Sequence, residues 1–140
     1  MMAYWLLKSE PDVYSFDDLK KAGQKGSEWT GIRNYLARNN MRAMKIGDKA
    51  FFYHSNIGLE IVGVAEVTAL SHPDSTTDDP RWDCVCIRAV APLLRPVTLE
   101  TCKVEPGLEA MVLVNNSRLS VQPVSAAEWR IICGLGGVAP

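Results

Sequence analysis

The chain has 140 residues, of which 47% are hydrophobic and 22% are charged, and its net charge is −1. This length is typical of a single domain that buries one core without disulfide or metal cross-links, and the composition excludes a disordered chain. The N-terminal segment lacks a basic region and a cleavage site, and its apolar run is too short to span a membrane. We therefore expect one domain over residues 1–140 in an intracellular, cytoplasmic protein without membrane contact.

The charge is unevenly distributed along the chain. Residues 20–49 contain eight Lys or Arg and two Asp or Glu, a net charge of +6, which leaves −7 for the rest. Such an asymmetry can attract a polyanion to one side of a domain. Charge runs are also common on solvated helical faces, so charge alone leaves both interpretations open.

Hydrophobic periodicity, caps and turn residues define the expected elements. Ser15 and Asp18 form a variant of the capping box, Ser125 and Glu128 form a complete one, and Gly63 inside a strand indicates a bulge or a close backbone approach. For the first half of the chain we predict a strand at 3–8, a helix at 16–22, a loop at 24–32, a helix at 33–44, strands at 50–55 and 59–70, and a polar loop at 71–82. For the second half we predict a strand at 83–94, a short helix at 99–103, an apolar segment at 108–114 that could be helix or strand, and a strand at 119–124. A last helix runs from 126 and ends at Gly134, and a frayed tail covers about 135–140. This irregular order predicts an α+β fold with a curved, partly closed sheet and not a doubly wound one.

Enzymatic chemistry has little support in the sequence. The four cysteines show neither CxxC spacing nor paired histidine ligands, which argues against a zinc site, and the common catalytic motifs are absent. One enzymatic alternative stays open, in which His54 activates Cys84 or Cys86 as the nucleophile of a nucleotide-processing hydrolase.

Aromatic and amide side chains instead gather at the ends of strands and in loops. Trp29 lies in a glycine-containing loop, and Trp82 closes a polar loop, whereas Trp5 within a strand is typical of a core residue. Aromatic faces stack on nucleobases, and amide and hydroxyl groups read the edges of bases. The pattern favours a binding pocket for a planar base.

The order of several motifs is similar to that of the EVE domain, a member of the PUA-like superfamily that includes the thymocyte nuclear protein family. The motifs are YWLLKSEP (4–11), SFDDL (15–19), WTGIRNYLARNNMRAMKIGD (29–48), FFYHS (51–55), IVGVAEV (61–67), HPD (72–74), RW (81–82) and LSVQPVS (119–125). The loop at 71–81 is shorter than in many members, which affects the expected rim of the pocket.

This resemblance implies a PUA-like fold, a strongly bent β-barrel with surrounding helices, and kinship with the YTH domain. It also implies a non-catalytic module, without metal or cofactor, that holds a modified base of DNA or RNA, with modified cytosine as one candidate. The ligand-binding residues that it implies are Lys8, Ser9, Glu10, Trp29, Gly31, Ile32, Arg33, Asn34, His54, Ser55, Asn56, Trp82, Leu119 and Ser120. The expected contacts to the nucleic-acid backbone are Arg38, Arg42 and Lys45. A protein-interaction adaptor with an acidic surface is a further alternative.

Overall fold

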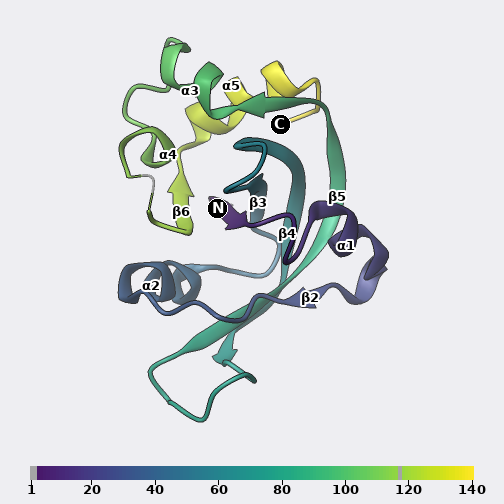
Figure 1. Ribbon diagram of the computed structural model, residues 1–140, viewed down its shortest axis with the longest axis vertical. Coiled ribbons are helices and arrows are strands. Elements are labelled where there is room, and N and C mark those ends of the chain that lie inside the picture. The colour runs from purple at the N-terminus through teal and green to yellow at the C-terminus, as the bar shows by residue number, and fades with distance from the viewer. Residues whose placement is uncertain (1–2, 117) are drawn as a thin grey trace.

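The computed structural model describes residues 3–116 and 118–140, which form one mixed sheet surrounded by helices (Figure 1). The strands are β1 (Tyr4–Ser9), β2 (Ser27–Glu28), β3 (Lys49–His54), β4 (Glu60–Pro73), β5 (Asp83–Thr98) and β6 (Val121–Val124). The α-helices are α1 (Phe16–Lys21), α2 (Tyr35–Ala43), α3 (Leu99–Val104), α4 (Val112–Asn115) and α5 (Ala126–Gly136), and a 3₁₀ turn covers Gly23–Lys25. The α+β class expected from the sequence is confirmed.

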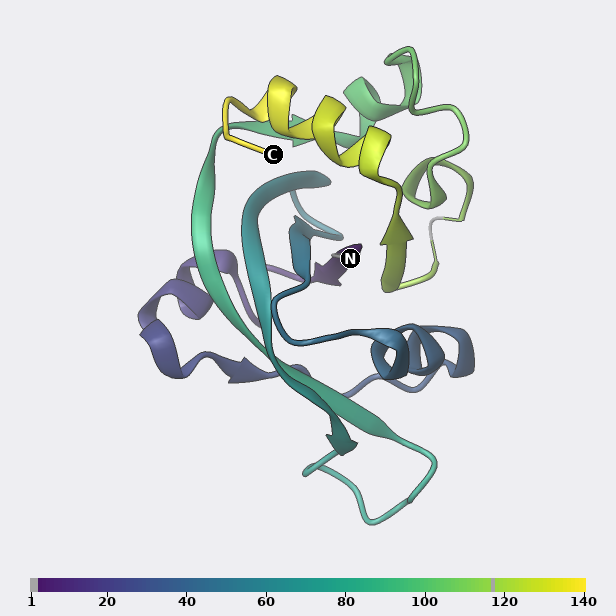
Figure 2. The same cartoon turned by 180° about the vertical axis from the view of Figure 1, so that it is seen from behind.

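The sheet is open and strongly curled. Its strand order is β2-β5-β4-β3-β1-β6, with β1 parallel to β3 and the other neighbouring pairs antiparallel. The long strands β4 and β5 twist around each other along the length of the molecule, while α5 lies across one end and α2 near the other (Figures 1 and 2). Several register shifts interrupt the β4–β5 pairing. Such irregularities bend the strands and increase their twist, which curls the sheet.

Gly63 shows both features that its position in a strand predicted. The pairing register shifts between Ile61 and Gly63, and a Cβ atom on Gly63 would lie 2.3 Å from Cζ of Phe16. The Phe16 ring packs in turn edge-on against Phe52, with ring centroids 5.4 Å apart. The absence of a side chain at Gly63 therefore allows α1 to pack directly on the sheet.

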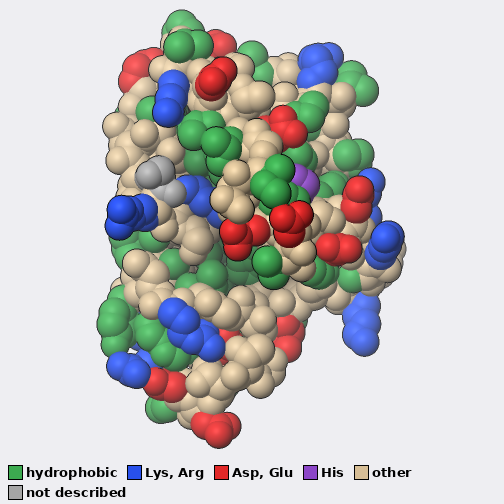
Figure 3. Space-filling model, viewed as in Figure 1, with side chains coloured by type: hydrophobic (Ala, Val, Ile, Leu, Met, Phe, Trp, Pro, Cys, Tyr) green, Lys and Arg blue, Asp and Glu red, His purple; other side chains and the backbone are tan. Residues whose placement is uncertain are grey.

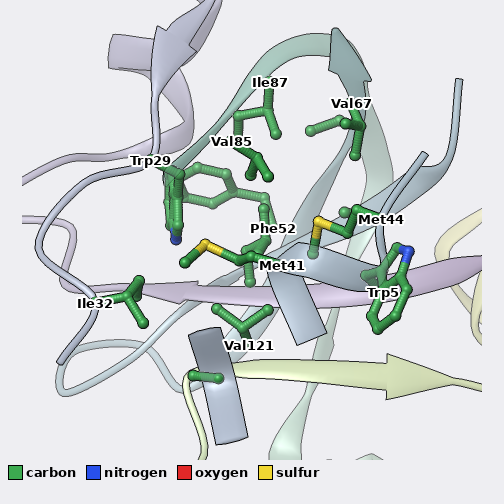
Figure 4. Packing of buried hydrophobic residues seen from close by; sticks show 14 of the residues in the cluster. Trp5, Trp29, Ile32, Met41, Met44, Phe52, Val67, Val85, Ile87 and Val121 are labelled. Atoms are coloured by element: carbon green, nitrogen blue, oxygen red, sulfur yellow. The ribbon is translucent and has the colours of Figure 1, made fainter. Parts of the chain in front are cut away.

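Two clusters of buried side chains cover the two faces of the sheet. One cluster lies between the sheet, α1 and α2, and includes Trp5, Trp29 and Phe52 (Figure 4). The other includes Phe51 on the sheet and Trp129 on α5, whose rings stack with centroids 3.9 Å apart. Trp5 is the core residue that the sequence predicted, and its indole N–H donates to Asp48 Oδ2 at 3.0 Å.

The capping residues predicted two helix starts correctly, but the glycine signal misplaced one helix end. Both predicted capping boxes, at Ser15 and Ser125, have their two reciprocal hydrogen bonds. The prediction that the last helix ends at Gly134, and that a frayed tail begins near residue 135, was wrong. Helix α5 continues to Gly136, because the left-handed cap conformation, with φ of 75°, occurs at Gly137.

Other element boundaries also differ from the sequence prediction. Helix α2 begins two residues later than expected, and the strand predicted at 59–70 continues to Pro73 because it pairs with β5 as far as Asp83. The ambiguous segment contains the short helix α4. Within the described residues, no helix is both long enough and apolar enough to cross a membrane.

Candidate functional site

A cavity of about 320 Å³ opens where β1 ends and β2 leads into the loop that precedes α2. Its volume lies at the lower end of the range of about 300–1,000 Å³ that is common for small-molecule sites. The lining residues are Lys8, Ser9, Val13, Tyr14, Ser27, Glu28, Trp29, Thr30 and Ile32. The face shown in Figure 3 is hollowed near its centre, with hydrophobic side chains at the bottom of the hollow and charged side chains around it.

Trp29 is the aromatic wall of this cavity and is held firmly in place. Its backbone N–H donates to the carbonyl of Val85 at 2.7 Å, and the residue is 7% exposed. The indole makes edge contacts with Phe52 and Tyr14, at centroid distances of 5.5 and 6.3 Å. Figure 4 shows Trp29 within the core cluster, beside Phe52 and Met41. One residue therefore belongs to the hydrophobic core and also lines the cavity.

Hydroxyl groups and one amine supply polarity to the cavity. The Ser9 hydroxyl donates to the carbonyl of Tyr14 at 2.6 Å, and the hydroxyls of Tyr14 and Ser27 form a hydrogen bond with each other. Lys8 is half-buried, and this burial lowers the pKa of its amine below the ordinary lysine value. The Lys8 amine also lies over the ring of Tyr53, 5.7 Å from its centroid. The cavity thus combines an aromatic surface with donors and acceptors, which is the chemistry that a nucleobase requires.

The loop that follows Trp29 is anchored by one buried carboxylate. Asp74 accepts hydrogen bonds from the backbone N–H of Gly31 at 2.9 Å, from Arg33 at 3.1 Å and from the backbone N–H of Thr76 at 2.7 Å. Asn34 is the N-cap of α2, and its side chain accepts from the N–H of Ala37 at 2.9 Å. Gly31, Arg33 and Asn34, all predicted site residues, therefore fix the loop and the helix behind the cavity.

Several other predicted site residues support the cavity through their backbones. The Ser55 N–H donates to the carbonyl of Ser9, and the Lys8 N–H donates to the carbonyl of Ser120, both at 2.9 Å. The Glu10 carbonyl accepts the N–H of Val13 and of Tyr14 and so closes the turn that leads to the cavity wall. These bonds position Lys8, Ser9 and Tyr14.

The remaining predicted residues lie outside the residues that line the cavity. Trp82, 8% exposed, packs on Tyr35 with centroids 5.1 Å apart. Leu119 is buried and borders a separate hollow beside α2 and α4, and Asn56 is exposed with φ of 69°. Of the two tryptophans predicted for the pocket, Trp29 lines this cavity and Trp82 does not.

The pairing of His54 with Cys84 or Cys86, on which the hydrolase alternative depended, does not occur. His54 Nε2 accepts the backbone N–H of Phe16 at 3.1 Å, and burial lowers the pKa of the imidazole. Cys84 instead contacts His72, with Sγ 3.3 Å from Nε2. The register of β4 and β5 places His72, and not His54, opposite Cys84.

Two arginines of the basic segment are engaged in intramolecular contacts. Arg42 forms an ion pair with Asp83, and Arg38 donates to the carbonyl of Arg81 at 3.0 Å. Lys45 is exposed just beyond the end of α2, and no ion pair is found for it among the described residues. Of the three residues expected to contact the nucleic-acid backbone, Lys45 is thus the most available to a phosphate.

The cavity also contains residues that the sequence interpretation missed, namely Val13, Tyr14, Ser27, Glu28 and Thr30. Ser27, Glu28 and Thr30 lie within two residues of Trp29 in the sequence, and this proximity could have identified them as cavity residues. Val13 and Tyr14 reach the cavity through the turn after β1, for which the local sequence offered no comparable indication.

Comparison with solved structures defines the fold class. Protein Atu2648 from Agrobacterium tumefaciens has a TM-score of 0.96 and 59% identity, and the match covers 98% of this chain and 94% of that one. The human THYN1 protein, solved in complex with 5-methylcytosine containing DNA, has a TM-score of 0.90 and 33% identity over 99% of both chains. A YTH domain of Zygosaccharomyces rouxii has a TM-score of 0.58 at 22% identity, over 96% of this chain and 86% of that one, which is a likeness of fold alone. The chain has the PUA-like α+β fold that the motifs implied.

Sequence comparison gives the family. The model of the EVE domain matches residues 3–135. Thymocyte nuclear protein 1 of Mus musculus is 36% identical over an alignment of 169 residues. The alignment covers 98% of this chain and 75% of the relative. The chain belongs to the EVE domain family.

Proposed function

We propose that this protein is a non-catalytic reader that holds a modified nucleobase, 5-methylcytosine in DNA, in the cavity beside Trp29. The observation that carries the proposal is the cavity itself, with a fixed indole in its wall and hydroxyl groups around it. The human relative in complex with 5-methylcytosine containing DNA supports the choice of ligand.

The base reaches the cavity only after it leaves the helical stack, at a cost of a few kcal/mol in a duplex. Contact with an aromatic surface returns about 1–3 kcal/mol. In this proposal the hydroxyls of Ser9, Tyr14 and Ser27, which line the cavity, read the polar edge of the base, and the Lys8 amine contacts a carbonyl or a phosphate. The added methyl group contributes roughly 1 kcal/mol of apolar burial, which corresponds to about a 5-fold preference over cytosine.

The chemistry of the thiol nearest to a histidine favours binding over catalysis. Burial, together with the negative charges of Glu28 and Asp74, raises the pKa of Cys84 to about 12. The thiol is therefore protonated near neutral pH, whereas a nucleophilic cysteine reacts as the thiolate.

The test compares two tryptophans that are equally buried and differently placed. Trp29→Ala is a poor probe, because truncation of a buried tryptophan costs about 3–5 kcal/mol of folding stability. Trp29→Phe keeps an aromatic ring in the core but reduces the surface offered to the base. Trp82→Phe is the matched control, since Trp82 is 8% exposed and lies outside the residues that line the cavity.

Binding is measured by fluorescence anisotropy with oligonucleotides that carry cytosine, 5-methylcytosine or other modified bases. We expect the 5-methylcytosine oligonucleotide to bind best and Trp29→Phe to weaken its binding several-fold, while Trp82→Phe leaves it unchanged. Equal affinity for all oligonucleotides, or equal effects of the two substitutions, would overturn the proposal.

A further inference from the structure

Three potential metal ligands from neighbouring strands converge at one point of the sheet. They are Glu28 on β2, His72 on β4 and Cys84 on β5, and one ligand atom of each lies within 4.8 Å of the others. His72 and Cys84 face each other in the β4–β5 register, and β2 pairs with β5 through Glu28 and Cys86. The positions of the three side chains are therefore set by the backbone of the sheet.

The separations of the ligand atoms suit a small tetrahedral ion. His72 Nε2 lies 3.1 Å from Glu28 Oε2 and 3.3 Å from Cys84 Sγ, and the latter two atoms are 3.8 Å apart. Bonds of about 2.0–2.3 Å from Zn²⁺ to N, O and S ligands imply separations of roughly 3.3–3.6 Å between ligands in a tetrahedron. The three atoms thus approximate one face of a tetrahedron, with the fourth position left for solvent.

Hydrogen bonds outside the cluster orient two of the ligands. His72 Nδ1 lies 2.8 Å from the carbonyl of Leu70, which can only accept, so Nδ1 carries a proton and Nε2 is directed at the cluster. The Ser75 hydroxyl donates to Glu28 Oε1 at 2.8 Å and leaves Oε2 facing His72. Histidine and carboxylate ligands of metals are typically held by such outer contacts.

Nε2 of His72 can share only one proton, while Glu28 Oε2 and Cys84 Sγ both approach it. The Cys84 thiol is also placed to donate to Glu28 Oε2, at 3.8 Å. A neutral imidazole would place a lone pair of Nε2 against the Glu28 carboxylate. Either a proton on Nε2 or a cation at the centre removes this conflict, and a cation would also bind Cys84 as a thiolate once the thiol has lost its proton.

We propose that Glu28, His72 and Cys84 form a binding site for one Zn²⁺ ion. A thiolate, an imidazole and a carboxylate are the ligand types that Zn²⁺ accepts, and thiolate with imidazole disfavours Mg²⁺ and Ca²⁺. The side chains of His72 and Glu28 are 35% and 42% exposed, which gives the ion a path from solvent, while Cys84 closes the site from the inside. Two anionic ligands neutralise the ion.

Binding displaces protons in a defined way. The Cys84 thiol loses its proton to solvent when the S–Zn bond forms, and a protonated His72 also loses the proton on Nε2. Affinity for Zn²⁺ therefore rises with pH. No zinc signature is visible in the sequence, because the ligands lie 12, 44 and 56 positions apart and meet only through strand pairing.

The experiment titrates Zn²⁺ into the full chain, stripped with a chelator and reduced with a phosphine, and follows heat and proton release. We expect one ion per chain, loss of binding in Cys84→Ser and His72→Gln, and binding weakened by about 10- to 100-fold in Ser75→Ala. Cys86→Ser, which alters the neighbouring thiol on the same strand, is the matched control and should bind normally.

Cobalt provides a readout that is independent of the variants' folding. Co²⁺ in the wild-type chain should give a sulfur-to-cobalt charge-transfer band and the strong visible absorption of tetrahedral coordination, and Zn²⁺ should abolish both. Absence of Zn²⁺ binding to the wild-type chain, absence of the thiolate band, or equal binding by Cys84→Ser would overturn the proposal. Loss of binding in Cys86→Ser would overturn the assigned ligands.

Discussion

Asp74 offers a quantitative test of how the loop beside the cavity is held. Its side chain is fully buried and receives hydrogen bonds from the N–H groups of Gly31 and Thr76 and from Arg33. In Asp74→Asn, an amide replaces one carboxylate oxygen, so at least one of these donors loses its acceptor and Arg33 loses its charge partner. Hydrogen bonds to charged groups contribute about 1.5–3 kcal/mol each, but Arg33 is 40% exposed and partly rehydrated.

We therefore expect Asp74→Asn to lower the free energy of unfolding by about 2–4 kcal/mol at pH 7, measured by urea unfolding followed by circular dichroism. Asp78→Asn is the control, because Asp78 is an exposed carboxyl of the same loop, and it should change stability by less than about 0.5 kcal/mol. A loss of similar size in both variants would refute the reasoning.

The pH dependence of the same variant tests the electrostatic part. Burial raises the pKa of Asp74, but the hydrogen bonds from Thr76, Gly31 and Arg33 outweigh it and hold the pKa well below the ordinary value. A depressed pKa stabilises the fold above the unfolded-state pKa of about 3.9, and that contribution is lost as pH falls toward the folded-state pKa. The stability difference between wild type and Asp74→Asn should be constant from pH 7 to 5 and shrink below pH 4. A difference that is unchanged at pH 3 would contradict this account.

Two further predictions follow from packing and from surface charge. Gly63→Ala should lower the free energy of unfolding by about 1–3 kcal/mol in urea, because the new Cβ would overlap the Phe16 ring. Phe16→Leu in that background should recover part of the loss. Full stability of Gly63→Ala would contradict this packing. Lys45→Ala should make the slope of log DNA affinity against log salt concentration shallower by about 1. Lys103→Ala, which removes an exposed lysine of α3, should leave the slope unchanged. Equal slopes for the two variants would exclude Lys45 as a phosphate contact.

Features that depend on a few adjacent residues were predictable from the sequence. The capping boxes at Ser15 and Ser125 are local because the cap and its partner lie three residues apart. The choice between Gly134 and Gly137 as the helix end was not local, because Cys133 and Gly136 are buried against the rest of the fold and hold the last turn helical.

The site was only partly predictable, because its composition depends on strand register. Lys8, Ser9, Trp29 and Ile32 were predicted and line the cavity. The contact of Cys84 with His72 depends on register shifts between Val67 and His72, and such shifts have no reliable signature in the sequence.

The double role of Trp29 limits the flexibility of the site, and the small difference between the two bases limits its selectivity. Because the indole is fixed by Phe52 and Tyr14, little conformational entropy remains to be lost there when a base binds. Cytosine and 5-methylcytosine differ only by a methyl group and offer the same polar edge, so unmethylated cytosine leaves no polar group of the cavity newly unpaired. Strong rejection of an analogue requires such an unpaired group, whereas a missing methyl changes affinity only modestly. A 5-fold preference for 5-methylcytosine is thus consistent with this cavity, and a preference above about 100-fold would require a polar contact that forms only in the complex.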